Sequence, residues 1–116
     1  MQTYLVLLHE STEASRPELS PEEMQALIAR YKAWGRRLRD SGRLVGSNKL
    51  EDGTGRVLRS EGGQLRITDG PFTETKDVLG GYFMFQAESF EEAAELCKDS
   101  PHLDLGAVEI RRIEVV

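Results

Sequence analysis

A single cysteine, only two histidines and a deficit of basic residues exclude several classes of chemistry from this chain. Cys97 has no second cysteine to pair with, so the 116 residues hold no internal disulfide and no cysteine-based metal cage. The two histidines are isolated and lack closely spaced carboxylates, which predicts that no metal is bound. The glycine-rich stretches lack the Lys-Ser/Thr ending of a phosphate loop, so we expect no nucleotide or other cofactor.

Acidic residues outnumber basic ones by 20 to 15, and the net charge of −5 predicts no nucleic-acid partner. Binding to a phosphate backbone needs a basic patch or stripe. The apolar runs are too short for a membrane span or a secretion signal. Because the chain relies on no disulfide, we expect a cytoplasmic protein. Its length fits one domain over residues 1–116.

Two short segments, residues 3–8 and 79–87, are apolar at nearly every position. A strand with two apolar faces is buried on both sides. Helices can cover one face of such a sheet, and the other face needs a cover because exposed apolar surface is unfavourable in water. A second copy of the chain is the simplest cover, so we predict a homodimer formed through the sheet face.

Two helices have clear sequence signals. The first begins at Ser20-Pro21-Glu22-Glu23, a capping-box pattern with proline at the first helical position, and Gly42 is a natural stop. Its apolar stripe has three- and four-residue spacing and consists of Met24, Leu27, Ile28, Tyr31, Trp34 and Leu38. The second begins at Ser89 with similar capping logic and ends before Pro101.

Residues 56–60 and 64–68 flank a Glu-Gly-Gly turn, which predicts a β-hairpin. Residues 44–55 are a glycine-rich connection with room for a short extended piece. The last strand, 107–116, changes phase at Arg111-Arg112, which predicts a bulge there. The whole order favours a ferredoxin-like α+β fold of the dimeric α+β barrel type, with an antiparallel sheet, two helices on one face and an extra β-hairpin.

One eight-residue motif and the strand after it carry a family resemblance. The motif is Asp69-Gly70-Pro71-Phe72-Thr73-Glu74-Thr75-Lys76, and the strand begins Leu79-Gly80-Gly81-Tyr82. Together they resemble the signature of the DGPF-domain family, which belongs to the broader YCII-related group. The likeness extends to the opening strand, to Asp40-Ser41-Gly42-Arg43-Leu44 and to Gly106-Ala107-Val108-Glu109-Ile110-Arg111.

This resemblance implies a ferredoxin-like fold and a dimer built through the sheet. Some relatives in the wider group are small enzymes that act on organic acids or aromatic rings without a metal. Others are encoded beside sigma factors. A histidine–aspartate pair is the proposed active site of the group, and the first predicted helix of this chain contains no histidine.

Asp69, His9 and His102 are the candidate catalytic residues. Aspartate is a general base or an orienter in such sites, and histidine titrates near neutral pH. Each also has a structural reading: Asp69 folds a turn in which Gly70 has positive φ, and each histidine is a loop residue. We expect both histidines at one end of the sheet. We expect the strand 79–87 to run parallel to the first, which puts the Asp69 loop at the opposite end, so that a joint site forms only across a dimer.

Five further residues are candidates for ligand binding. Thr73, Glu74 and Lys76 follow the Asp-Gly-Pro turn, with more polar chemistry than a turn needs, and Lys76 suits an anionic group. Tyr82 lies on the central strand. Trp34 lies on the helical apolar stripe, where packing in the core is the simpler interpretation.

Two functions follow as hypotheses. The first is a metal-independent enzyme that uses acid–base chemistry on a small organic acid or aromatic compound, which predicts a pocket with converging titratable groups. The alternative is a non-catalytic module that binds a small ligand or a regulatory protein and is linked to sigma-factor signalling. It predicts an exposed apolar or charged patch in place of such a pocket.

Overall fold

The computed structural model describes residues 1–11, 18–70 and 77–116. The elements in chain order are β1 (Gln2–Ser11), α1 (Pro21–Asp40), β2 (Leu44–Lys49), β3 (Arg56–Glu61), β4 (Gln64–Asp69), β5 (Asp77–Ala87), α2 (Phe90–Cys97), the 3₁₀ helix η1 (Pro101–Asp104) and β6 (Gly106–Arg112). Among the described residues, neither α-helix is long and apolar enough to cross a membrane.

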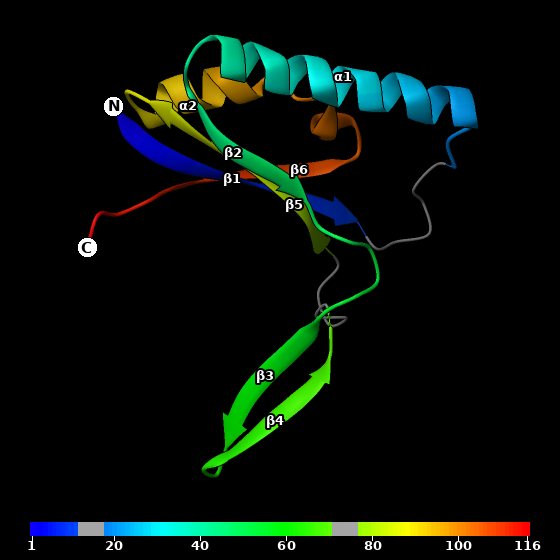
Figure 1. Cartoon of the computed structure of the whole chain (residues 1–116), viewed down its shortest axis with the longest axis vertical. Helices are drawn as coiled ribbons and strands as arrows, with labels where there is room; N and C mark the ends of the chain where they lie inside the picture. The colour runs from blue at the N-terminus through cyan, green and yellow to red at the C-terminus, as the bar shows by residue number, and fades with distance from the viewer. Residues whose placement is uncertain (12–17, 71–76) are drawn as a thin grey trace.

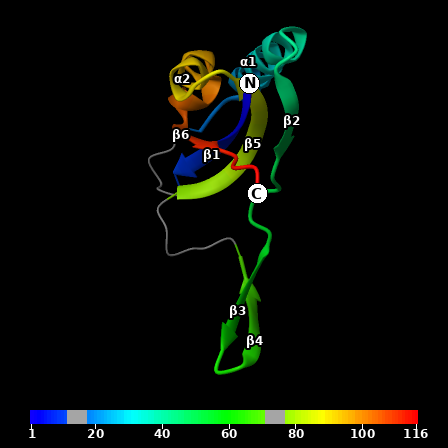
Figure 2. The same ribbon diagram turned by 90° about the vertical axis from the view of Figure 1, so that its left-hand side faces the viewer.

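Four strands form one sheet in the order β2-β5-β1-β6, and every neighbouring pair is antiparallel. Both α-helices lie on one face of this sheet, as Figures 1 and 2 show from two directions. The predicted ferredoxin-like α+β fold is therefore confirmed. The glycine-rich connection after the first helix supplies the edge strand β2, which sequence reasoning described only as a short extended piece.

The expected direction of β5 is wrong. β5 is antiparallel to β1, with Ser11 opposite Asp77 at one end of the pair and Gln2 opposite Ala87 at the other. The helical crossover from β1 makes β2 the parallel strand, and β5 forms hydrogen bonds between the two. The end of β1, the beginning of β5 and the beginning of β6 therefore meet at one end of the sheet.

Helix α1 begins and ends where its sequence signals place it. The Ser20 hydroxyl accepts a hydrogen bond from the Glu23 amide at 3.1 Å, and the Glu23 carboxylate accepts one from the Ser20 amide at 3.2 Å. This reciprocal pair satisfies two amides that the first turn leaves unpaired. At the other end Gly42 has φ of 75°, a conformation that glycine adopts without steric cost.

The core lies between the helices and the sheet. Tyr4, Val6 and Leu8 alternate along β1 on the face that the helices cover, and Phe83 and Phe85 do so on β5. A fully buried side chain of this size contributes roughly 1.5–3 kcal/mol relative to an exposed one. This layer anchors both α-helices.

The helical spacing of apolar residues in the sequence predicts two further core residues, and both are buried. Trp34 packs against Phe83 with a ring-centroid distance of 4.4 Å, and its indole nitrogen donates to the Leu96 carbonyl at 3.0 Å. Cys97 is also buried, and burial raises the pKa of its thiol to about 12. The thiol is therefore a structural group rather than a nucleophile.

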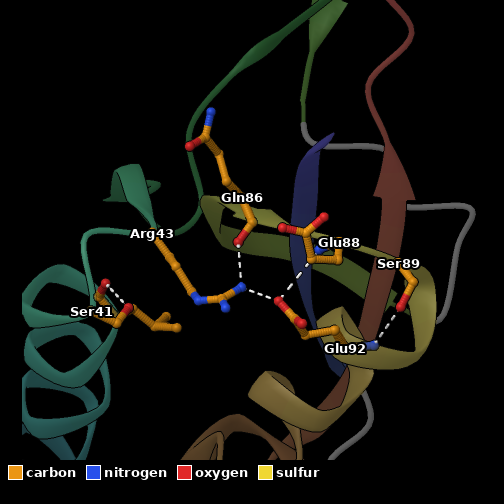
Figure 3. A network of polar contacts seen from close by, with 7 residues as sticks. Ser41, Arg43, Gln86, Glu88, Ser89 and Glu92 are labelled. Carbon is orange, nitrogen blue, oxygen red and sulfur yellow. Dashed lines mark hydrogen bonds and ion pairs between the residues drawn. The ribbon is translucent and has the colours of Figure 1, made fainter. Parts of the chain in front are cut away.

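Arg43, in the connection between α1 and β2, links the end of β5 to the first turn of α2 (Figure 3). Its guanidinium donates to the Gln86 carbonyl at 3.3 Å and forms an ion pair with Glu92. Glu92 also accepts from the Glu88 amide at 3.3 Å, and its own amide donates to the Ser89 hydroxyl at 3.1 Å. The beginning of α2 is thus fixed to the first βαβ unit by side-chain contacts as well as by the core.

Strands β3 and β4 form the predicted hairpin as a separate two-stranded sheet that projects away from the body (Figure 1). Gly62 and Gly63 make its turn with φ of 56° and 81°, and two positive values are what a type I′ hairpin turn requires. Every residue of β3 and β4 except Val57 is exposed. The hairpin adds nothing to the core.

Two other local expectations are wrong. β6 pairs with β1 without a register shift up to Arg112, so the predicted bulge is absent, and the irregularities lie in β5 and β2. Gly70 is not among the described residues with positive φ. A side chain there would instead meet Val57 at 3.2 Å, so close packing at the base of the hairpin explains this glycine.

Candidate functional site

A cavity of about 540 Å³ lies between the first half of α1 and the end of the sheet where β1 ends and β5 begins. Its apolar lining includes Leu8, Met24, Leu27, Ile28, Phe83 and Leu105. Its polar lining includes Glu10, Tyr31, Lys32, Asn48, Lys49 and His102. A mostly apolar wall with a few converging polar groups is the usual composition of a small-molecule site.

The first half of α1 forms one wall of this cavity. Met24 and Ile28 belong to the same apolar stripe as Trp34, yet their exposed fractions are 41% and 45%, whereas that of Trp34 is 2%. The stripe therefore continues beyond the core and turns its apolar side chains toward the cavity. Apolar surface left open in this way favours an apolar ligand.

The central polar feature of the cavity is a hydrogen-bonded chain from Tyr31 through His102. The Tyr31 hydroxyl lies 2.6 Å from Nδ1 of His102, and Nε2 of His102 lies 2.7 Å from the backbone carbonyl oxygen of His9. A carbonyl only accepts, so Nε2 carries a proton. In the neutral ring Nδ1 then accepts from the Tyr31 hydroxyl, and this tautomer follows from the hydrogen-bond network.

Local structure fixes His102 in this position. It is 1% exposed and lies in η1, whose N-cap Ser100 accepts a hydrogen bond from the His102 amide at 3.3 Å. Gly106 follows η1, and a side chain at Gly106 would lie 2.1 Å from the His9 carbonyl oxygen. Only glycine lets the chain pass this close to the acceptor that orients the imidazole.

Glu10 brings a carboxylate to the same cavity from the end of β1. A side chain at Gly80 would lie 2.6 Å from the Glu10 carboxylate oxygen, and one at Gly81 would lie 2.9 Å from the Asn48 carbonyl oxygen. The two glycines of the Leu-Gly-Gly-Tyr sequence therefore leave space for the carboxylate and for the edge strand. The register shift of the β1–β5 pair also lies here, between Leu8 and His9.

The His9 side chain belongs to the opposite face of the sheet. Its Nε2 lies 2.8 Å from a carboxylate oxygen of Glu109 on β6. The hydrogen bond from His9 is the main cause that lowers the pKa of Glu109 below its ordinary value. The main-chain carbonyl of His9 thus orients His102, and its side chain forms an ion pair on the other face of the sheet.

The other sequence-predicted residues lie away from the cavity. Asp69, at the end of β4, is 93% exposed in its side chain and pairs with Arg56 at 3.4 Å. The Tyr82 hydroxyl accepts from the Asn48 side chain at 2.9 Å on the helix-free face. Trp34 is a core residue. Thr73, Glu74 and Lys76 lie outside the described residues.

Of the two histidines proposed from the sequence, His102 lines the cavity, together with Tyr31 and Glu10, which the sequence reasoning did not propose as site residues. Both histidines were expected at one end of the sheet, and the 2.7 Å contact from His102 to the His9 carbonyl places them there. The apolar stripe predicts that Tyr31 is a core residue, and no sequence motif singles out Glu10. One available signal was the position of Glu10 at the end of an otherwise apolar strand.

The described residues contain no group of three histidine, cysteine, aspartate or glutamate side chains placed to hold a metal ion. The polar groups of the cavity suit proton transfer and hydrogen bonding. The phenol and the imidazole form one connected path, and Glu10 and Lys32 add charges of both signs to the wall.

Comparison with known proteins agrees with the fold. The model of the YCII-related domain family matches residues 3–116. An uncharacterized protein of Rhizobium meliloti (strain 1021) is 29% identical over 111 residues, which are 93% of this chain and 89% of that protein. A solved structure of 5-chloro-2-hydroxyhydroquinone dehydrochlorinase from Burkholderia phenoliruptrix AC1100, in complex with 2,5-dihydroxybenzoquinone, is similar with a TM-score of 0.55 and 16% identity, over 97% of this chain and 93% of that one.

Proposed function

Because this chain belongs to the YCII-related domain family, we propose that it is a metal-independent enzyme that moves protons on a small aromatic compound or organic acid. The observation that supports the proposal is the Tyr31–His102 pair in the wall of a mostly apolar cavity. The structural neighbour acts on a chlorinated hydroxyhydroquinone by its name, which makes an aromatic substrate the first class to test.

The proposed proton path uses both groups. A proton leaves an oxygen or an activated carbon of the substrate for the Tyr31 oxygen, and the Tyr31 proton moves to Nδ1 of His102. The imidazolium that forms keeps its proton on Nε2, which donates a hydrogen bond to the His9 carbonyl oxygen 2.7 Å away. Reversal of these two transfers returns a proton to the product, so the cycle needs no oxidant or reductant. General acid–base catalysis of this kind contributes about 10²–10⁴-fold in rate.

The cavity suits a compound of one ring. A volume of about 540 Å³ lies within the range of small-molecule sites, roughly 300–1,000 Å³. The apolar wall from Met24 and Ile28 can cover one face of a ring, while Tyr31 reaches a hydroxyl or carbonyl substituent. Such a ring would exclude water from the phenol and strengthen its hydrogen bonds.

The direct test is exchange of carbon-bound protons in D₂O, followed by proton NMR. The substrates are 2,5-dihydroxybenzoquinone and a panel of other hydroxyquinones and small keto acids. We expect the protein to accelerate exchange for at least one of them and Tyr31→Phe to reduce the acceleration by about 10²-fold or more, since the relay loses its hydroxyl.

Tyr82→Phe is the matched control, because it removes a hydroxyl with one hydrogen-bond partner from the other face of the sheet. It should retain the wild-type rate. The proposal is wrong if no compound exchanges faster and none perturbs the NMR signals of cavity residues. If Tyr82→Phe loses proton exchange while Tyr31→Phe keeps full activity, the proposed site is wrong and the active site lies on the helix-free face of the sheet.

We also propose that the chain forms a homodimer through the helix-free face of the sheet. Leu5, Leu7, Tyr82 and Met84 alternate with core residues and are only partly buried there. A second copy would remove this apolar surface from water. Light scattering should give twice the monomer mass, and Leu7→Arg should halve it. A wild-type monomer at micromolar concentration would contradict this proposal.

One observation favours the regulator-binding module as a second candidate. The exposed hairpin carries Leu58, Leu65 and Ile67 with exposed fractions of 57%, 63% and 59%. An apolar surface on a projecting arm is suited to a protein partner. Replacement of the three by serine should abolish recovery of a regulatory protein and leave proton exchange intact. Wild-type protein that recovers no partner at stoichiometric amounts would eliminate this candidate.

A further inference from the structure

A second, smaller cavity adjoins the one already described. It has a volume of about 360 Å³ and lies between α1 and the edge strand β2. The side chains of Lys32, Arg36 and Arg39 line it from the helix, Ser47 lines it from β2, and Gly35 and Phe83 form its inner part. We refer to this cavity as the cationic cleft.

The charge of the cationic cleft is unusual for this molecule. The chain carries a net charge of −5, yet the lining of the cleft contains three cations and, among the described residues, no acidic side chain. No ion pair forms between these cations and any carboxylate in the part of the chain that the structure describes. Arg30, on the same helix, is by contrast paired with Asp104 at 2.9 Å.

Helix stability accounts for Arg39, which lies in the last turn near the negative end of the helix dipole, but not for Lys32 and Arg36 beside each other. Lys32, Arg36 and Arg39 are separated by four and three residues and therefore lie on one face of α1. Like charges at this spacing destabilise a helix by about 0.2–0.5 kcal/mol a pair. A bound anion would remove the repulsion, and arginine is the residue best suited to bidentate contact with carboxylate or phosphate.

The cationic cleft is continuous with the larger cavity. Tyr31, Lys32, Ser47 and Phe83 line both. Arg36 lies five residues beyond Tyr31, about 7.5 Å along a helix that rises 1.5 Å per residue. One ring with an anionic substituent is long enough to reach from the Tyr31 hydroxyl toward Arg36.

We propose that the cationic cleft binds the anionic group, a carboxylate or a phosphate, of the same ligand whose ring occupies the larger cavity. The inference rests on the proposed function for the position of the ring, and it adds the charge that the substrate carries. Gly35 supports it sterically, because the absent side chain leaves depth between the helix and Phe83.

The test is an NMR titration of the full-length protein with three ligands of one ring: 4-hydroxybenzoate, phenyl phosphate and phenol. The variant is Arg36→Gln/Arg39→Gln. We expect it to raise the Kd of at least one anionic ligand by about tenfold or more, because a hydrogen bond to a charged group contributes roughly 1.5–3 kcal/mol. The Kd of phenol should change less than about twofold, because phenol has no group for the cleft.

Arg37→Gln is the matched control. It removes one positive charge from the same turn of α1, and Arg37 does not line the cleft. It should leave all three Kd values unchanged. The anionic ligand that loses affinity in the double variant identifies the source, carboxylate or phosphate.

Inorganic phosphate, titrated alone, separates this inference from the proposed function because it needs no ring cavity. We expect it to shift the amide signals of Gly35 and Ser47 in the wild type and not in the double variant. If phenol perturbs the cavity while the double variant binds every ligand like the wild type, the inference is wrong and the proposed function stands. If phosphate shifts Gly35 and Ser47 while none of the three ring ligands perturbs the larger cavity, the cleft binds an anion and the proposed function is contradicted.

Discussion

The two halves of α1 carry the same apolar stripe and have different surroundings. In the second half, Trp34 and Leu38 are buried at 2% and 3% against the sheet. In the first half, Met24 and Ile28 remain more than 40% exposed and line a cavity. Tyr31 lies between them, with its ring toward the core and its hydroxyl on His102. An uninterrupted helical pattern thus covers first a cavity and then the core.

The comparison teaches that one apolar stripe of a helix can pack on a core along one half of its length and line a cavity along the other half. The sheet strands supply Phe83 and Phe85 beneath the second half. Under the first half lie Glu10 and His102, which carry polar groups. The stability of the protein should therefore depend on one half of α1 and ligand affinity on the other.

The largest expected effect is that of Trp34→Ala in the buried half. The substitution removes the contact with Phe83 and the hydrogen bond to Leu96, so we expect a loss of about 3–5 kcal/mol in the free energy of unfolding. Urea denaturation followed by circular dichroism measures it. Met24→Ala is the control in the exposed half and should cost far less. Equal losses for both would abolish the distinction between the halves.

Gly35→Ala tests the boundary between the exposed and the buried half of α1, and it should stabilise the protein. A new Cβ would meet Phe83 at 3.5 Å, an ordinary contact, and alanine favours a helix over glycine by about 0.5–1 kcal/mol. Thermal unfolding should show a higher Tm. The same methyl group narrows the cationic cleft, so binding of anionic ring compounds should weaken. A lower Tm would mean that the helix cannot accept any side chain here.

Ile28→Ala should change the free energy of unfolding by less than about 1 kcal/mol, because the side chain is 45% exposed and alanine is the better helix former. Its expected effect is on ligands. Removal of part of the cavity wall should weaken the binding of a ring compound, measured by NMR titration. Unchanged affinity combined with a large loss of stability would contradict the assignment of the first half to binding.

The smallest expected effect is on the pH dependence of stability, and it concerns the Glu109 carboxylate on the face of the sheet that the helices do not cover. The hydrogen bond from His9 is the main cause that holds the pKa of Glu109 below its ordinary value. A carboxyl whose pKa is lowered by folding stabilises the protein above its unfolded pKa, and the contribution is lost as pH falls through the folded pKa. Urea midpoints measured below pH 5 should therefore fall less steeply for Glu109→Gln than for the wild type. Glu114→Gln, which removes an exposed carboxylate beyond the end of β6, should follow the wild type.

Local chemistry made several elements predictable. The Ser20 capping box, the Gly42 stop and the Gly62-Gly63 turn each satisfy a backbone requirement within a few residues, so the sequence pattern was sufficient. The position of both histidines at one end of the sheet also followed from the order of the elements. The likeness of the motifs to the YCII-related group agrees with the family model.

The errors arose where distant segments meet. The direction of β5 depends on which strands lie beside it, and neither the apolar pattern nor the turn before it specifies that choice. Gly70 was interpreted through its own backbone, whereas the contact with Val57 explains it. The pairing of Asp69 with Arg56 is likewise a contact between two strands that the turn residues beside Asp69 do not specify.

Capping residues, hairpin glycines and apolar periodicity determined where the helices and the hairpin form, because these interactions act over one or two turns of chain. The site needed contacts across the whole chain: Tyr31 from α1, the carbonyl of His9 from β1 and the imidazole of His102 from η1. Hydrogen bonds between residues 71 and 93 positions apart leave no periodic trace in a sequence. Only tertiary packing could bring them together and leave half of α1 open above them.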